Sequence, residues 1–413
     1  MSLWHIAWSY LWNRKLTTCL TIASVALGVG LIYSVLTLRE ETRKRFEEEG
    51  QIFDVVVGAK GSPLQLVLSA LYFMDQPTGN IALSDYEAIR QHEDVAAAFP
   101  VGLGDSYHGY RIVGTSRDIF DYTWTNASSG AVKKPFTLAE GQLFDDHMEA
   151  VVGSTVAETE GLKVGDTFIG AHGFTELPEG MGHGHENHPY TVVGILAPSG
   201  GAMDRVVFCS LDSVWDVHHQ DEVGDKADLS EKQVTAVLVS LHSPGSRFEF
   251  VDYVNESFNA MATIPVRQIQ NLYDNVLGVA KSILLTVGYL VVVISAISIL
   301  IGLYLSILQR KRDLAIMRAL GASASEIVGS VLIEALLVTV MGIFAGWLVG
   351  NLVCSVLSVL ITQNYGLSIS AFGALTSDEI TAFSIVALVG LMAGIGPAWQ
   401  AYRTDVARDL AEL

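Results

Sequence analysis

Four long apolar stretches alternate with polar segments along the chain. They cover residues 16–38, 282–308, 327–361 and 380–399. A helix needs roughly 20 apolar residues to cross the hydrocarbon core of a bilayer, so each stretch predicts a transmembrane helix. The first stretch is longer than the apolar part of a signal peptide and no small-residue cleavage site follows it, so we interpret it as an uncleaved anchor. Glu334 is the one charge that we place inside a span, and we expect it to pair with a basic residue of the loop 309–326, for instance Arg312 or Arg318.

Residues 39–281, between the first two predicted membrane helices, have the short apolar runs separated by turn residues that are typical of an α+β domain. Short apolar runs bounded by turn residues predict strands at 53–57, 110–113, 150–152, 190–195, 206–208 and 234–241. Helices are expected at 84–92, where Ser84 and Glu87 fit a capping box, and at 248–261. The charged segment 38–50 should extend the first membrane helix as a stalk, and 266–281 should lead as a helix into the second.

Residues 61–74 are unusually apolar for a segment of a polar domain. They could contact a substrate or graze the membrane. We favour a helix buried in the core of the domain.

Charge separates the same two parts of the chain. The 413 residues carry a net charge of −19, and residues 39–278 hold 36 of the 44 acidic and 16 of the 25 basic side chains. Such an acidic block does not favour binding to nucleic acid. Cys19, Cys209 and Cys354 are too few and too scattered for a disulfide framework or a cysteine metal site.

Basic residues predict the orientation. Short loops rich in Lys and Arg stay in the cytoplasm, and such residues precede the first span and fill the loop 309–326. We therefore expect both termini and this loop in the cytoplasm, with 39–281 and 362–379 outside. Trp4, Trp8 and Trp12 recur every four residues, which predicts a helix over 1–15 lying at the inner membrane interface. The alternative is a helix packed on the protein's own spans.

The loop after the second span has a recognisable pattern. Residues 309–334 read QRKRDLAIMRALGASASEIVGSVLIE. This stretch resembles the cytoplasmic loop of the MacB/FtsX/LolC-type permeases, the type VII or mechanotransmission ABC transporters. The positions that match the family pattern are Arg312, Asp313, Ile316, Arg318, Ala319, Gly321, Ala322, Ile327 and Glu334. Asp-Leu replaces the usual Glu-Ile, which is a mild departure.

Three further segments carry the same resemblance: 8–28, 150–211 and 397–410. The resemblance implies an α-helical membrane protein with four transmembrane helices and a large α+β periplasmic domain, a MacB-like periplasmic core, between helices 1 and 2. The expected division is an interfacial helix at 1–15, spans at 16–38, 282–308, 327–361 and 380–399, a stalk and periplasmic domain at 39–281, a coupling loop at 309–326, a periplasmic loop at 362–379 and a cytoplasmic tail at 400–413.

In this family the loop docks into a groove of the ATPase, so the resemblance implies that role for Arg312, Asp313, Met317, Arg318, Leu320, Gly321 and Ala322. Physically, a short amphipathic helix ended by a glycine forms a rigid knob. Its charges can pair with a soluble partner, while Leu314, Met317 and Leu320 offer an apolar contact. The sequence contains no G-x-x-x-x-G-K-[ST] phosphate loop. We therefore expect no intrinsic cofactor, no enzymatic site, and ATP bound by a partner chain.

A histidine-rich tract interrupts the periplasmic core pattern. His183, His185, Glu186 and His188 lie in a glycine-rich stretch, and imidazole and carboxylate groups are good ligands for Zn²⁺ or another divalent metal. The alternative is a polar loop whose histidines are solvated.

Three hypotheses on function follow. The first is an inner-membrane permease subunit that couples ATP hydrolysis by a separate ATPase to periplasmic movements, acting on a lipoprotein, peptide or small molecule by mechanotransmission. The second is a metal-handling transporter that uses the histidine tract. The third is an FtsX-like regulator of a periplasmic cell-wall hydrolase. Expected partners are the ATPase, a second permease copy or paralogue, membrane lipids and a periplasmic protein.

Overall fold

The computed structural model describes residues 3–125, 130–173, 188–221, 232–365 and 375–403. The chain divides into two compact units. The helical unit contains Met1–Glu41, Leu277–Ser358 and Ile369–Leu413. The sheet unit contains Thr42–Val276 and Val359–Ser368.

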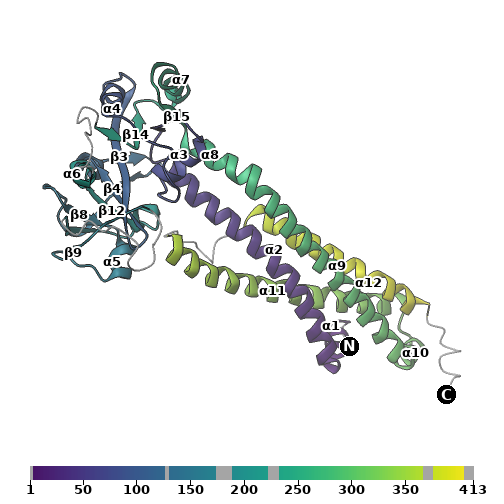
Figure 1. Cartoon of the computed structure of the whole chain (residues 1–413). Coiled ribbons are helices and arrows are strands. Elements are labelled where there is room, and N and C mark those ends of the chain that lie inside the picture. The colour runs from purple at the N-terminus through teal and green to yellow at the C-terminus, as the bar shows by residue number, and fades with distance from the viewer. Residues whose placement is uncertain (1–2, 126–129, 174–187, 222–231, 366–374, 404–413) are drawn as a thin grey trace. The chain divides into compact units, whose positions relative to one another are not determined.

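Helices build the helical unit (Figure 1). They are α1 (Leu3–Asn13), α2 (Lys15–Gly50), α9 (Gly278–Gln309), α10 (Lys311–Ala319), α11 (Ala324–Tyr365) and α12 (Ser377–Tyr402). Four helices of the described chain are long and apolar enough to cross a membrane: α2, α9 with its lead-in from Pro265, α11 and α12. They lie over the four apolar stretches of the sequence. The charged segment 38–50 continues α2 without a break, as predicted.

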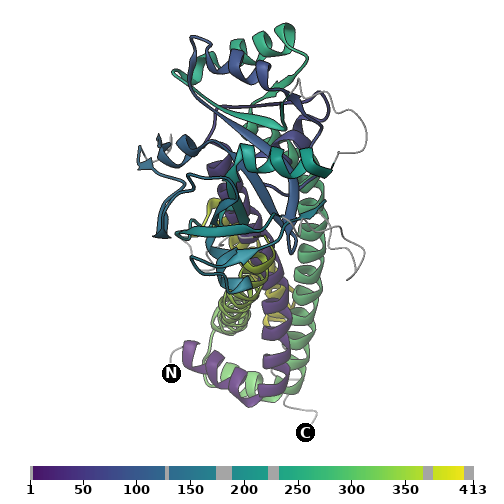
Figure 2. The same ribbon diagram turned by 60° about the vertical axis from the view of Figure 1, so that its left-hand side comes forward.

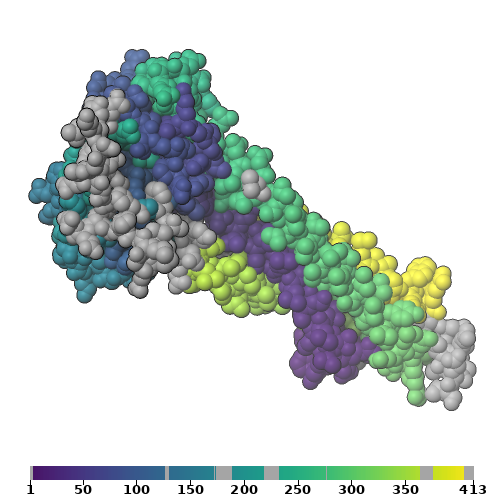
Figure 3. All heavy atoms as spheres, viewed as in Figure 1, coloured from purple at the N-terminus to yellow at the C-terminus, as the bar shows by residue number. Residues whose placement is uncertain are grey.

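Small residues let the long helices approach closely. A Cβ atom on Gly342 or Gly346 of α11 would lie 2.6 Å from Cβ of Val25 or Val29 of α2. On the next seam, Ser24 of α2 and Ser295 of α9 share a hydrogen bond of 2.8 Å, and α2 and α9 run side by side in the space-filling view (Figure 3). Glycine and serine seams of this kind are typical of helix packing within membranes, where close backbone approach replaces the hydrophobic effect.

The sheet unit is built on one large mixed sheet. Among the described residues, eleven strands join it, in the order β15-β1-β14-β3-β4-β12-β8-β11-β7, with β10 on β3 and β9 on β11. These strands are β1 (Val55–Gly58), β3 (Val95–Tyr107), β4 (Tyr110–Thr115), β7 (Leu138–Gly141), β8 (Glu149–Val152), β9 (Thr167–Phe168), β10 (Ala171–His172), β11 (Tyr190–Leu196), β12 (Val206–Ser210), β14 (Ala236–Leu241) and β15 (Met261–Thr263). Two small ribbons pair β2 (Ile81–Ala82) with β13 (Gln233–Val234) and β5 (Trp124–Thr125) with β6 (Val132–Lys133).

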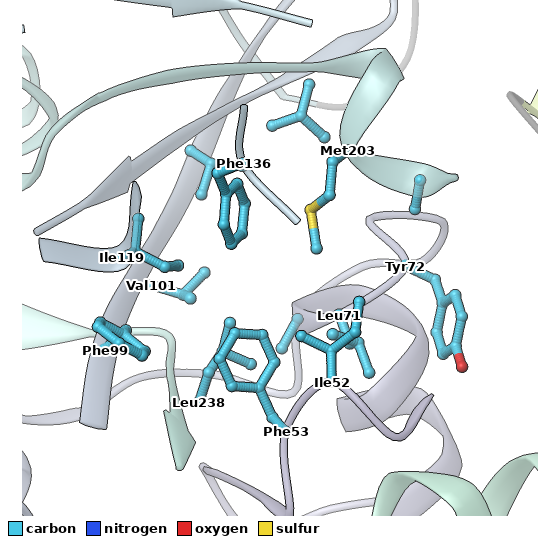
Figure 4. Packing of buried hydrophobic residues seen from close by; sticks show 14 of the residues in the cluster. Ile52, Phe53, Leu71, Tyr72, Phe99, Val101, Ile119, Phe136, Met203 and Leu238 are labelled. Atoms are coloured by element: carbon cyan, nitrogen blue, oxygen red, sulfur yellow. The ribbon is translucent and has the colours of Figure 1, made fainter. Parts of the chain in front are cut away.

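Both faces of this sheet are buried along β1 and β14, which explains why these two strands are nearly continuous apolar runs. Side chains alternate between the two faces of a strand. Val56 of β1 and Leu238 of β14 enter one core together with Ile52 and Met203. Figure 4 shows Leu238, Ile52 and Met203 in this apolar interior. Their neighbours Val55 and Val57 enter a second core on the opposite face. A strand buried on both faces needs no polar alternation.

Short helices cover the sheet. They are α3 (Pro63–Ala70), α4 (Leu83–Arg90), α5 (Ser154–Glu160), α6 (Leu211–Asp221), α7 (Arg247–Ser257) and α8 (Pro265–Asn271), with 3-10 turns η1 (Arg117–Asp121), η2 (Ala202–Arg205) and η3 (Pro244–Ser246) and a π turn, η4 (Leu272–Leu277). The apolar segment 61–74 forms α3, whose Leu66, Val67 and Ala70 are buried in the core. The favoured interpretation of a core helix is therefore confirmed.

Two local predictions in the sheet unit are wrong. Helix α4 begins after Ala82, and no side chain caps it, so Ser84 and Glu87 do not form a capping box. The helix predicted over 248–261 ends at Ser257, because residues 261–263 pair with β1 as strand β15.

Candidate ATPase-coupling site

Helix α10 is a short helix between two breaks in the chain. It starts after Arg310, where α9 ends. Its other end is closed by Gly321, which has a φ of +103°, while the amide of Ala322 donates to the carbonyl of Met317 at 2.9 Å. A left-handed residue with returning amide bonds is a standard helix C-terminus, and glycine adopts it without a steric penalty. The predicted knob, a short helix ended by Gly321, is therefore present.

The surface of α10 mixes charge with exposed apolar groups. Arg312 and Asp313 are exposed, Leu320 is 84% exposed and Ile316 is 41% exposed. Arg318 and Met317 are half-buried. An exposed leucine beside exposed charges is the pattern of a surface that can dock on a protein partner.

Leu314 does not belong to this surface, contrary to expectation. It is 1% exposed and packs in the core of the helical unit with Leu11, Ile307 and Ile327. The spacing of Leu314, Met317 and Leu320 suggested one apolar stripe. In the structure Leu314 anchors α10 to the unit, and Ile316 takes its place on the exposed side.

A buried ion pair fixes the start of α10. Arg310 donates through Nη2 to Oε2 of Glu334 at 2.7 Å, and the two side chains are only 6% and 4% exposed. Glu334 therefore pairs with a basic residue of the loop 309–326, as expected, but its partner is Arg310 and not Arg312 or Arg318. The pair joins the end of α9 to α11 across the break that precedes α10. Charges buried in this way are retained only when they are paired.

Helix α1 contacts the same corner of the helical unit (Figures 1 and 2). The guanidinium of Arg310 lies 4.1 Å from the centre of the Tyr10 ring. Arg14, which follows α1, donates to the side chain of Gln309 and to the carbonyl of Ser306 at 3.4 Å. Arg310 and its neighbours therefore connect the start of α10 with α1, α9 and α11.

The tryptophan face of α1 points away from the rest of the helical unit. Trp4, Trp8 and Trp12 are 55%, 52% and 61% exposed, whereas Ala7 and Leu11 are buried against it. Each indole thus has about half of its surface exposed, and Lys15 at the start of α2 lies 4.8 Å from the centre of the Trp12 ring. This favours a helix that presents its indoles to a membrane interface.

A second polar cluster lies where α12 begins. Glu379 is 3% exposed and accepts a hydrogen bond of 2.6 Å from the hydroxyl of Thr37 in α2. It also completes a capping box with Thr376. The cluster fixes the first turn of α12 to α2.

The proposed metal ligands fall mostly outside the described residues. His183, His185 and Glu186 are not described, and His188 is the only member of the set that is. Within the described ranges no group of three or more His, Cys, Asp or Glu side chains could hold a metal ion. The divalent-metal hypothesis therefore stays a prediction from the sequence.

Sequence reasoning placed the partner of Glu334 in the basic loop but did not single out Arg310, and it missed Tyr10. An arginine at the end of an apolar stretch and a glutamate inside the next one form a natural pair. Tyr10 was hidden by the more conspicuous tryptophans of its helix.

Four membrane-spanning helices, a large α/β domain inserted after the first of them, and a short helix linking the second and third define a permease-like membrane protein. Comparison with known families agrees. The family described as MacB-like periplasmic core domain matches residues 18–256, and the FtsX-like permease C-terminal family matches 285–406. The chain belongs to the MacB/FtsX-type ABC transporter permease family.

Two curated relatives illustrate the match. The macrolide export ATP-binding/permease protein MacB of Nitrosomonas europaea is 22% identical over 97% of this chain and 57% of its own length. The pyoverdine export ATP-binding/permease protein PvdT of Pseudomonas fluorescens is 24% identical over 97% of this chain and 57% of its own length. The chain thus spans little more than half the length of these relatives.

Among solved structures, the periplasmic region of MacB from Actinobacillus actinomycetemcomitans aligns with 56% of this chain and 97% of its own length, at 10% identity and a TM-score of 0.35.

Proposed function

We propose that the chain is the permease subunit of an ABC exporter and that a separate chain hydrolyses ATP. The observation that carries this proposal is α10, a rigid knob with exposed Leu320, Ile316, Arg312 and Asp313. The relatives are described as ATP-binding/permease proteins, whereas the present sequence contains no phosphate-loop motif.

The proposed orientation places α1, α10 and the end of α12 in the cytoplasm and the sheet unit in the periplasm. Basic residues support this orientation, because α10 contains Lys311, Arg312 and Arg318 and short segments rich in Lys and Arg stay in the cytoplasm. Four helices are few for a transport pathway, so we propose that two permease copies act together on the membrane.

The proposed mechanism is mechanotransmission. Closure of the ATPase on ATP would displace α10, and the contacts of Arg310 with Glu334 and Tyr10 would pass this displacement to α11 and α1. Helix α2 supports the next step because it continues unbroken from Lys15 to Gly50, where its last turns belong to the sheet unit. The proposed cargo is a lipoprotein, peptide or small molecule. The named relatives are exporters, so they favour neither metal handling nor regulation of a hydrolase.

The test is the introduction of a negative charge at the exposed end of α10. We expect Leu320→Glu to weaken co-purification with the co-expressed ATPase by more than about tenfold, because an exposed anchor residue of an interface contributes about 2 kcal/mol or more. The purified variant should keep its thermal stability, since this side chain contributes little to the fold.

Arg403→Glu is the matched control. Arg403 lies just after α12 on the proposed cytoplasmic side, is exposed and stacks on Trp399, so ATPase assembly should be unchanged. Normal assembly and normal ATPase stimulation in the Leu320→Glu variant would refute the proposed docking surface.

A further inference from the structure

A cavity of about 360 Å³ lies within the sheet unit, where the last turns of α2 meet two other segments. Helix α2 contributes Arg45, Glu48 and Glu49, the ribbon of β5 and β6 contributes Trp124 and Lys133, and the loop 199–203 before β12 closes the remaining side. This volume is within the range of small-molecule sites, roughly 300–1,000 Å³.

The inner wall of the cavity is apolar. Ile52, Trp124 and Met203 line it and are 8%, 8% and 5% exposed. Ile52 and Met203 also belong to the main core, where Figure 4 shows them among aromatic and aliphatic side chains. Because this wall is part of a close-packed core, it is a preformed surface and needs no rearrangement to receive an apolar group.

The outer wall carries three cations. They are Arg45, Lys133 and Lys134. The Nζ atom of Lys133 lies 5.9 Å from the centre of the Trp124 ring and 3.4 Å from Oε2 of Glu48. The Nζ atom of Lys134 lies 3.4 Å from Oδ1 of Asp121. Good charge-assisted hydrogen bonds measure about 2.7–2.9 Å, so both ion pairs are loose. Each lysine is also about half exposed, and exposed pairs of this kind contribute little. The ammonium groups can therefore turn toward a ligand at small cost.

Glu49 is the acid nearest the inner wall, and it is largely protonated at neutral pH. Its Oε1 accepts a hydrogen bond of 3.2 Å from the amide of Ala202. Burial is the main cause that raises the pKa of its carboxyl to about 8. The charges of Asp204 and Glu48 raise this pKa further, and the hydrogen bond from the Ala202 amide and the charge of Arg45 lower it. Near pH 7 the residues that line the cavity therefore carry three cations and the carboxylate of Glu48, while the carboxylates of Asp121 and Asp204 lie outside the lining.

The other titratable groups that face Glu49 are already engaged. Asp204 accepts hydrogen bonds from the amides of Ser199 and Gly200 and from the hydroxyl of Ser199, at 2.7–3.1 Å. The hydroxyl of Tyr72 donates to the carbonyl of Phe46, and burial raises the pKa of Tyr72 well above its usual value, so it stays neutral.

We propose that this cavity binds a small amphipathic carboxylate, with its apolar body against Ile52, Trp124 and Met203 and its acid group beside Arg45, Lys133 and Lys134. An apolar pocket with a few convergent polar groups is the usual form of a ligand site, and the three cations on its outer wall favour an anion. The proposal does not depend on the ATPase docking at α10.

The experiment uses three probes of nearly the same shape on the purified full chain in detergent. They are 4-phenylbutyrate, its neutral amide and the cationic 4-phenylbutylamine, with binding measured by calorimetry or by saturation-transfer NMR. We expect the acid to bind at least tenfold more tightly than the amide, and the amine to bind most weakly. Equal binding of acid and amide, stronger binding of the amine, or no saturable binding of the acid would each overturn the proposal.

Two double variants locate the site. Lys133→Gln with Lys134→Gln should weaken binding of the acid by about tenfold and leave the amide unchanged, since a charged hydrogen bond is worth about a factor of ten. Lys60→Gln with Lys163→Gln removes two exposed lysines that do not line the cavity, and it should change nothing. Equal effects of the two pairs would show only a general attraction to positive charge and would overturn the site.

A pH series adds a readout specific to Glu49. From pH 6 to pH 9 the probe stays ionised and the lysines stay charged, so ionisation of Glu49 is the main change in the cavity. Binding of 4-phenylbutyrate should weaken over this range, and Glu49→Gln should remove the dependence. An unchanged pH profile in the Glu49→Gln variant would contradict the proposed position of the acid group.

Discussion

Breaking the Arg310–Glu334 pair tests how the coupling helix is held. The perturbation is Glu334→Leu, which leaves the guanidinium of Arg310 without its carboxylate partner in a site where both side chains are at most 6% exposed. Removing one partner of a buried pair costs about 3–5 kcal/mol because the remaining charge stays desolvated. The ring of Tyr10, 4.1 Å from Arg310, offsets only about 1 kcal/mol of this.

Replacing both partners gives the opposite expectation. The double variant Arg310→Met, Glu334→Leu removes both charges and fills the space with apolar groups, which is often close to neutral for stability. A double-mutant cycle should therefore show a coupling of about 2–4 kcal/mol between the two positions.

The assay is the thermal unfolding of the full chain in detergent, together with stimulation of the ATPase. Glu334→Leu should lower the melting temperature sharply, and the double variant should restore most of it. ATPase coupling should fall in both variants if the ion pair positions α10. A single variant as stable as the wild type, or a double variant as unstable as the sum of the singles, would refute this reasoning.

Two further predictions concern other parts of the chain. Burial raises the pKa of Glu49 from 4.5 to about 8, so between these pH values the folded state holds a proton that the unfolded state has lost. The free energy of unfolding should therefore fall as pH rises from about 5 to 8, by at most about 1.4 kcal/mol per pH unit. The melting temperature of the Glu49→Gln variant should depend less on pH over this range than that of the wild type. The same pH dependence in both proteins would contradict the raised pKa of Glu49. Gly346→Leu should destabilise the helical unit by about 1–3 kcal/mol, since a Cβ there meets Val29 at 2.6 Å and the Ala26 carbonyl at 2.8 Å. Gly396→Leu, which meets nothing within 4 Å, is the matched control; equal losses would show that the seam is not tightly packed.

The sequence was sufficient for features that depend on local pattern. Length and apolarity located the membrane helices, and Gly321 located the end of α10, because only glycine adopts its left-handed conformation without a steric penalty. Apolar runs bounded by turn residues located most of the sheet's longer strands. The capping box at Ser84 failed because a short motif of this kind recurs by chance, and the chain turns into α4 one residue earlier.

Features built from distant segments could not be predicted. Arg310 and Glu334 lie on separate helices, and their contact depends on where α9 breaks before α10. Strand order is equally non-local, since β1 pairs with β14 and β15 from the far end of the domain. The cavity beside Glu49 needs three segments far apart in the sequence, none of which has a distinctive motif.

The burial of both faces of the large sheet along β1 and β14 has a consequence for biogenesis. Strands such as Val55–Gly58 and Ala236–Leu241 are as apolar as membrane segments. In the proposed orientation, an export channel that sorts chains by hydrophobicity would meet them before they have paired. Their shortness resolves the conflict, since a few apolar residues fall well below the roughly 20 needed to span a bilayer. Substitutions that join two such runs into one longer stretch would therefore be expected to divert the domain into the membrane before it could fold.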